Sequence, residues 1–317
     1  MKNETGEEMT SLRPFFLCAL GVFFGSVLDA TVKAIAADTP VLTLTAWRFL
    51  FGAVIVLGIY LGRGGGMPTA AAIRFHTMRG AVYSITVLSF FSALAILPLA
   101  MATVIGFTAA LMVAPVARLI LKERMNRTAV LAALIGFAGV ALTATGFGGT
   151  EIEPQARWLG VAFALVAAVT YAMTLVLIRL RAQTEDSVTI VMFSNVVAAV
   201  FTWIVLIGAA LVMKDGPPIW PGAAGLPALG LLAVIGVSVW LLMTFAYSGA
   251  EAGRLAPFEY TALVWSAMFG AVFFGEVPGL RLYAGAAIII GACLLVAFET
   301  HFTARREARL PASDILE

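Results

Sequence analysis

Two residues of opposite charge, Asp29 and Lys33, lie four positions apart inside an apolar segment, 14–37, that is long enough to cross a bilayer. A charge at the centre of a bilayer costs about 2.5–3.5 kcal/mol on insertion scales, so it is retained only where it is paired or faces a polar interior. An i, i+4 spacing places both side chains on one face of a helix, where they can form an ion pair. Gly21 and Gly25 extend this face and allow a neighbouring helix to approach closely. The pattern predicts a bundle with a polar interior.

Arg48 is a third charged candidate, in the third turn of the apolar segment 41–62. Its guanidinium is always charged and could hold a carboxylate or phosphate with two hydrogen bonds. The alternative is a structural ion pair with Asp29 that joins the first two helices. The same two alternatives, substrate binding or helix packing, stay open for Asp29 and Lys33.

Glu259 follows Pro257 in the apolar segment 253–275. A proline removes one helical hydrogen bond and leaves a carbonyl free, and interrupted helices are typical of transporter binding sites. The alternative is a pair between Glu259 and Arg254 near the cytoplasmic mouth. If transport is coupled to protons, Asp29 or Glu259 would carry the proton, because a carboxyl shielded from water is the side chain suited to that task.

Aromatic side chains inside apolar segments could stack on a flat ligand through their π faces, or could simply pack against other helices. These residues are Tyr83, Tyr171, Trp240, Tyr260 and Trp265. The predicted substrate-binding set joins three of these aromatics to the four charged residues: Arg48, Asp29, Lys33, Glu259, Tyr83, Tyr260 and Trp265.

The composition of the chain indicates which kind of helix must position these residues. The chain has 317 residues, of which 61% are hydrophobic and 12% charged, against about 45–50% and 25% in soluble domains. Ten segments have the length and apolarity of membrane spans: 14–37, 41–62, 78–97, 100–121, 128–147, 157–178, 188–213, 225–249, 253–275 and 280–299. The predicted fold class is an all-α membrane protein with ten transmembrane helices.

The positions of Lys and Arg predict the orientation, since cytoplasmic loops are enriched in positive charge. With ten spans and a cytoplasmic N-terminus, three of the 20 Lys and Arg residues fall in periplasmic loops: Arg157, Lys214 and Arg281. Three more fall within spans, and the remainder lie on the cytoplasmic side. The sequence therefore predicts a multi-pass protein of a bacterial-type inner membrane with both termini in the cytoplasm. The basic tail, 300–317, is expected to lie on anionic lipid.

The chain repeats itself weakly. Thr108-Ala109 matches Thr261-Ala262 at an offset of 153, and the same offset carries Glu123 onto Glu276. An offset of 147 carries Arg48 onto Asn195. Because each half holds five spans, the second half would enter the membrane from the opposite side, as in the inverted repeats of secondary transporters. Glu123 and Glu276 are expected to have architectural roles.

Several short motifs recur in the order and spacing of a known family. They are Asp29-Ala30-Thr31-Val32-Lys33, Trp47-Arg48-Phe49, Leu97-Pro98-Leu99-Ala100, Tyr260-Thr261-Ala262-Leu263 and Phe273-Phe274-Gly275-Glu276-Val277-Pro278. The chain resembles the EamA-type transporters of the drug/metabolite transporter superfamily. The resemblance covers two modules, 13–147 and 157–299. It implies two inverted five-helix repeats around a central cavity and alternating access to it. The stretch from Pro257 to Leu263 looks closest to the branch that takes up vitamins and S-adenosylmethionine.

The sequence thus predicts a secondary transporter for a small polar or amphipathic metabolite, such as an amino-acid derivative or a compound like S-adenosylmethionine or a vitamin. Membrane lipid is the other expected partner, and nucleic acid is not expected. A membrane scaffold or receptor is the alternative, and an intramembrane enzyme is a more remote one. The sequence has no P-loop, H-E-x-x-H or G-x-S-x-G motif, and it places His76 in a loop. It therefore predicts no catalytic residue, metal site or cofactor. Substrate identity, transport direction, coupling ion and oligomeric state stay open.

Overall fold

A computed structural model describes residues 13–66, 69–122, 127–145, 152–179, 187–223, 225–249, 255 and 258–307, and every regular element in these ranges is an α-helix. The first half of the chain contains α1 (Arg13–Ala36), α2 (Val41–Gly62), α3 (Ala70–Ile96), α4 (Leu99–Gly106), α5 (Thr108–Leu121) and α6 (Arg127–Ala144). The second half contains α7 (Pro154–Arg179), α8 (Ser187–Val212), α9 (Leu226–Gly249), α11 (Ala262–Phe274) and α12 (Leu280–Glu307).

Seven helical stretches in the described ranges are long and apolar enough to cross a membrane. They are α1, α2, α3, α4 together with α5, α7, α8 and α9. Shorter apolar stretches of 10–17 residues lie in α6, α11 and α12. The chain is therefore an all-helical, multi-pass membrane protein, as predicted. The count of ten transmembrane helices stays a prediction.

Several helix ends differ from those predicted. Helix α3 begins at Ala70, eight residues before the predicted span, because the Thr69 side chain accepts a hydrogen bond from the Ala72 amide at 3.3 Å and caps its first turn. The prediction of a loop at His76 is therefore wrong, since His76 is a buried residue of α3. The predicted span 100–121 is interrupted at Phe107, between α4 and α5. Helix α12 continues to Glu307, into the stretch predicted as the tail.

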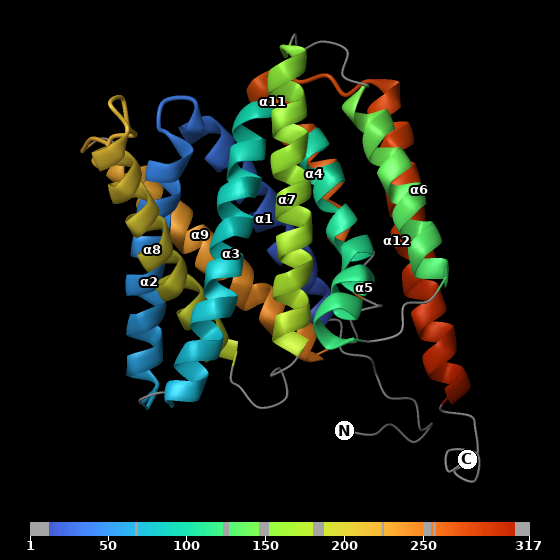
Figure 1. The fold of residues 1–317 in the computed structure, drawn as a ribbon, viewed down its shortest axis with the longest axis horizontal. Coiled ribbons are helices and arrows are strands. Elements are labelled where there is room, and N and C mark those ends of the chain that lie inside the picture. Colours follow the sequence, from blue (N-terminus) through green and yellow to red (C-terminus); the bar gives the residue numbers. More distant parts are fainter. Residues whose placement is uncertain are drawn as a thin grey trace.

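The helix pairs with the most extensive contacts follow a symmetric pattern. They are α6 with α12, α3 with α7, α1 with α9, and α2 with α8. In the predicted repeat, α1 corresponds to α7, α2 to α8, α3 to α9 and α6 to α12. Exchanging corresponding helices therefore leaves the pairs α6–α12 and α2–α8 unchanged and converts the pair α1–α9 into α3–α7. Figure 1 shows α1 and α7 crossing the bundle in opposite directions. This packing is the pattern that a twofold axis between two halves of opposite orientation produces.

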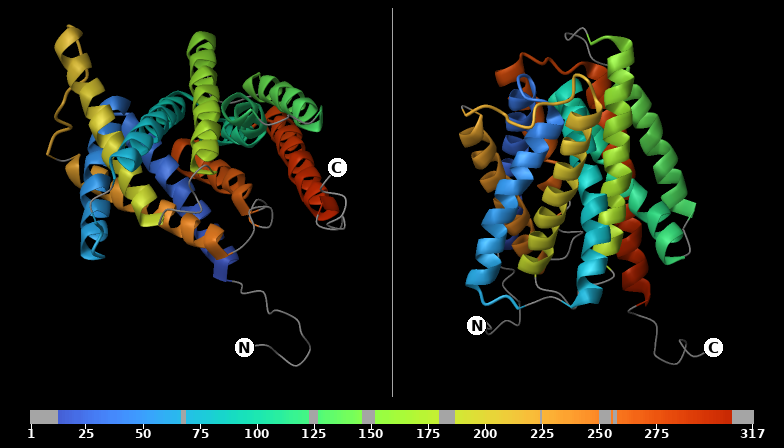
Figure 2. Two further views of the ribbon diagram at one scale, coloured as in Figure 1. Left: turned by 60° about the horizontal axis from the view of Figure 1, so that its bottom comes forward. Right: turned by 60° about the vertical axis from the view of Figure 1, so that its left-hand side comes forward.

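Helices α6 and α12 cross with their backbones close together. A Cβ atom at Gly285 would lie 2.7 Å from the carbonyl oxygen of Gly139, and one at Gly139 would lie 3.0 Å from the carbonyl oxygen of Gly285. Glycines permit such close approach between membrane helices. The two views of Figure 2 agree that α6 and α12 form a pair at one side of the bundle, with α2 and α8 at the other side. Helices α1, α3 and α7 lie between these two pairs.

Candidate functional site

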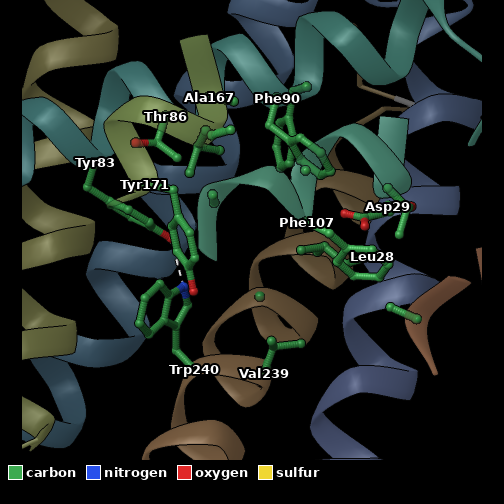
Figure 3. Close-up of a pocket in the computed structure, with 18 of the residues that line it drawn as sticks. Leu28, Asp29, Tyr83, Thr86, Phe90, Phe107, Ala167, Tyr171, Val239 and Trp240 are labelled. Carbon is green, nitrogen blue, oxygen red and sulfur yellow. Dashed lines mark hydrogen bonds between the residues drawn. The ribbon is translucent and has the colours of Figure 1, made fainter. Parts of the chain in front are cut away.

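A cavity of about 310 Å³ lies between the helices of both halves. The first half contributes residues of α1 to α5, and the second half contributes residues of α7, α9 and α11. Much of the lining is aromatic or aliphatic, and Figure 3 shows many of these side chains around the space. The polar side chains of the lining are Asp29, Arg48, Tyr83, Thr86, Thr103, Tyr171 and Trp240. This combination of an apolar wall and a few convergent polar groups is typical of small-molecule sites.

One side of the cavity is an aromatic wall, which we define as Tyr83, Tyr171 and Trp240. The indole Nε1–H of Trp240 donates a hydrogen bond of 2.7 Å to the Tyr83 hydroxyl, and Tyr171 lies beside this pair (Figure 3). The two bonded rings meet edge to face, with centroids 5.5 Å apart. Because Tyr83 belongs to the first half and Trp240 to the second, the wall is built jointly by both halves.

Asp29 faces the cavity from α1, on the side away from the Tyr83–Trp240 pair and next to Leu28 and Phe107 (Figure 3). Within the described residues, no ion pair or side-chain hydrogen bond involves the Asp29 carboxylate. The cavity therefore holds a carboxylate whose lone pairs are open to a donor from outside the protein.

Arg48 lines the same cavity from α2, and only 4% of its surface is exposed. Its Nε and Nη1 atoms are buried and have no hydrogen-bond partner in the structure. The guanidinium carbon lies 4.6 Å from the ring centroid of Phe49 and 5.4 Å from that of Phe91. No ion pair joins Arg48 to Asp29. The structural ion pair considered from the sequence is therefore not formed.

Lys33 belongs to a different cluster, which we call the outer cluster: Lys33, Glu276 and the backbone of residues 94–99. The Lys33 Nζ atom lies 3.2 Å from Glu276 Oε1 and donates hydrogen bonds to the carbonyl oxygens of Leu97 at 2.6 Å and Leu94 at 3.1 Å. The other carboxylate oxygen, Glu276 Oε2, accepts a hydrogen bond of 2.7 Å from the Leu99 amide. The predicted i, i+4 pair between Asp29 and Lys33 does not form, because Lys33 turns to Glu276.

Local backbone geometry explains how Glu276 reaches this position. Helix α11 ends at Gly275, whose φ of +63° is a left-handed conformation that glycine adopts without strain. The following amide of Glu276 donates back to the Gly270 carbonyl at 3.0 Å. A Cβ atom at Gly270 would lie 2.6 Å from Glu276 Oε2, so this glycine leaves room for the carboxylate. The turn directs Glu276 toward the first half of the chain.

The remaining predicted binding residues, Glu259, Tyr260 and Trp265, are not in the lining of the cavity. Glu259 accepts a hydrogen bond from the Tyr247 hydroxyl, and its alternative partner, Arg254, lies outside the described residues. The Tyr260 ring packs edge to face on Phe107 at 5.3 Å, and Phe107 does line the cavity. Trp265 packs edge to face on Phe23 at 4.9 Å.

Several lining residues carry no signal in the sequence that could have selected them. Phe90, Phe91 and Phe107 are ordinary apolar residues of membrane segments, and Gly236 is one of 30 glycines. Tyr171 and Trp240 appear in the aromatic set but not in the predicted binding set. Only the helix packing brings these residues to one space.

The fold and the cavity define a multi-pass helical membrane protein with a solute-sized space between its two halves. The family model of the EamA-like transporter family matches residues 12–145 and 158–298, and the chain belongs to that family.

The similar proteins include an uptake transporter and an exporter. The S-adenosylmethionine uptake transporter of Rickettsia bellii is 25% identical over 284 residues, which cover 88% of this chain and 91% of that protein. The pseudopaline exporter CntI of Pseudomonas aeruginosa is 26% identical over 281 residues, which cover 88% and 93%. A solved crystal structure with 22% identity and a TM-score of 0.58 covers 91% of this chain and 98% of its own, and it shows the same fold.

Proposed function

We propose that this protein is a secondary transporter that carries a small metabolite with both an anionic and a cationic group across the inner membrane by alternating access. The observation that carries the proposal is the state of Asp29 and Arg48, two opposite charges that line one cavity and are not paired with each other. Burying an unpaired charge is costly, so such groups are typically retained for a ligand.

The cavity suits a substrate of defined chemistry. Arg48 would bind a carboxylate, Asp29 would bind an ammonium group, and the aromatic wall would take a flat or apolar part. A volume of about 310 Å³ lies at the lower end of the range of small-molecule sites, about 300–1,000 Å³. An amino-acid derivative meets these requirements. S-adenosylmethionine, which the Rickettsia relative is named for, has a carboxylate, an ammonium group and a flat base.

The proposed architecture has ten transmembrane helices arranged as two inverted five-helix repeats, 13–147 and 157–299, with both termini in the cytoplasm. The symmetric helix pairing and the placement of the cavity between the halves support it. Helix α11 would form the described part of the ninth span, and α6 and α12 the fifth and tenth.

With cytoplasmic termini, the outer cluster lies at the periplasmic end of the bundle. Lys33 and Leu99 belong to the first half and Glu276 to the second, so these contacts join the two halves on that side. Alternating access requires the halves to separate there when the cavity opens outward. The outer cluster is thus the closure on the periplasmic side.

Proton coupling, if present, would use Asp29, because it lines the cavity without a protein partner. In proteoliposomes, a proton gradient should accelerate uptake by the wild type and not by Asp29→Asn. Counterflow without a gradient provides the control for binding. Equal stimulation of both proteins would exclude this role, and loss of stimulation in Glu259→Gln alone would assign the role to Glu259.

A thermal-shift experiment tests the substrate class. The probes are two matched pairs, S-adenosylmethionine with its decarboxylated form, and L-tryptophan with tryptamine. A bound ligand at 100 times its Kd stabilises the folded protein by about 2.7 kcal/mol. We expect the carboxylate-bearing member of at least one pair to stabilise the wild type more than its partner, and Arg48→Met to abolish the difference. No stabilisation by any probe contradicts the proposed substrate class, and binding without transport in proteoliposomes would favour a receptor.

A further inference from the structure

Gly236 of α9 is packed directly against the guanidinium of Arg48. A Cβ atom at Gly236 would lie 2.4 Å from Nη2, 3.1 Å from Cζ and 3.2 Å from Nε of Arg48. Real Cβ atoms do not approach other heavy atoms to within 2.4 Å. An alanine at this position would therefore force the guanidinium to move.

The surroundings limit where the guanidinium can go. Phe49 and Phe91 lie against it, and the side chain is almost fully buried. Both Gly236 and Arg48 line the cavity. A displaced guanidinium would change its position relative to the cavity, and hydrogen bonds to anions depend steeply on distance and angle.

We infer that Gly236 is a positioning residue that sets where Arg48 presents its guanidinium to the anionic group of the substrate. The inference rests on the proposed function, because it assumes that Arg48 binds that group. A residue of the second half of the chain would then control the position of a binding group that belongs to the first half. Selection for a carboxylate would thus depend on a residue that makes no hydrogen bond to the substrate.

The variant Gly236→Ala tests this inference and should not harm the fold. Alanine is a better helix former than glycine, and the three atoms nearest the added methyl group all belong to the far end of a long side chain. Gly230→Ala is the matched control, because Gly230 lies in the same helix and has no atom within 4 Å of an added Cβ. Gly230→Ala should unfold at or above the wild-type temperature without ligand, and Gly236→Ala should stay folded, so that their binding can be compared.

The two pairs of probes defined above provide the readout. We expect Gly236→Ala to bind the carboxylate-bearing probes at least about tenfold more weakly than the wild type, with little change for the decarboxylated probes. Gly230→Ala should bind all probes as the wild type does. In an Arg48→Met background, Gly236→Ala should have no further effect, since the two residues act through one interaction.

The outcomes separate the inference from the proposed function. If Gly236→Ala discriminates between the members of each pair as the wild type does, and Arg48→Met does not, the inference alone is overturned. Discrimination retained in Arg48→Met would overturn the assignment of Arg48 and the inference with it. If Gly236→Ala does not fold, the double variant Arg48→Met/Gly236→Ala decides whether the defect acts through Arg48. Recovery of folding in the double variant would support the inference, and failure to fold would overturn it.

Discussion

Lys33 and Arg48 are both basic residues inside the same bundle, but their surroundings differ. The Lys33 ammonium has three oxygen partners, and the carboxylate that it faces has a further amide donor. Arg48 has two buried nitrogen atoms without a partner, and Asp29 in the same cavity is unpaired in the described structure. Buried polar groups are normally satisfied. The outer cluster therefore has the character of a stabilising contact between the halves that is complete within the protein, and the cavity has that of a site completed by a ligand.

The largest expected effect comes from breaking the outer cluster. Lys33→Met leaves the Glu276 carboxylate buried without its counter-charge and should lower the free energy of unfolding by about 3–5 kcal/mol. Denaturant unfolding in detergent provides the measurement. The double variant Lys33→Met/Glu276→Gln should regain part of the loss, because no unpaired charge is left. A loss below about 1 kcal/mol in the single variant would contradict the structural role.

In contrast to Lys33→Met, Arg48→Met should weaken ligand binding without lowering stability. It removes a buried cation that has no protein counter-ion and replaces it with an apolar chain of similar length, so stability should stay unchanged or increase. Binding of the carboxylate-bearing probes should fall by about tenfold or more, the effect of losing a hydrogen bond to a charged group. Measuring unfolding and binding on one preparation tests both. Destabilisation as large as that of Lys33→Met would show that the two cations have equivalent roles.

A smaller effect is expected in the aromatic wall. Tyr83→Phe leaves the Trp240 indole N–H without its acceptor and should cost about 1–2 kcal/mol of stability. Tyr60→Phe is the control, because the Tyr60 hydroxyl donates to the Gly66 carbonyl in an exposed loop where water can replace it. Its effect should be close to zero. Equal losses in both variants would contradict the view that the cavity wall is locked by this hydrogen bond.

The sequence predicts the helical membrane class well, because apolar length and composition depend on local residues alone. It also singles out Asp29 and Arg48, which the structure places in the cavity lining, since charges inside apolar segments are rare enough to be noticed. Their role in substrate binding stays a prediction. The sequence fails to predict the partner of Lys33. The spacing to Asp29 is local, whereas the residue that forms the ion pair, Glu276, lies 243 residues further along the chain.

The repeat in the sequence predicts architecture better than chemistry. The offset that relates Arg48 to Asn195 gives these residues equivalent places, yet the Asn195 side chain donates to the Val191 carbonyl of its own helix at 2.9 Å. Gly52 of α2 packs against it, with 2.6 Å between an added Cβ and Asn195 Oδ1. Equivalent positions therefore carry an amide that donates within its own helix in one half and a guanidinium with two unsatisfied nitrogen atoms in the other. Side-chain chemistry and tertiary contacts decide this difference, and a sequence offset contains neither.

The bond between Glu276 and the Leu99 amide has a consequence for local stability. Leu99 is the first residue of α4, and the preceding Pro98 offers no side-chain cap. The amides at a helix start lack intrahelical partners and favour a negative charge, which here comes from the other half of the chain. The first turn of α4 should therefore fray whenever the halves separate at this end. Amide hydrogen exchange at Leu99 would then report how often the halves separate, without a ligand or an attached probe.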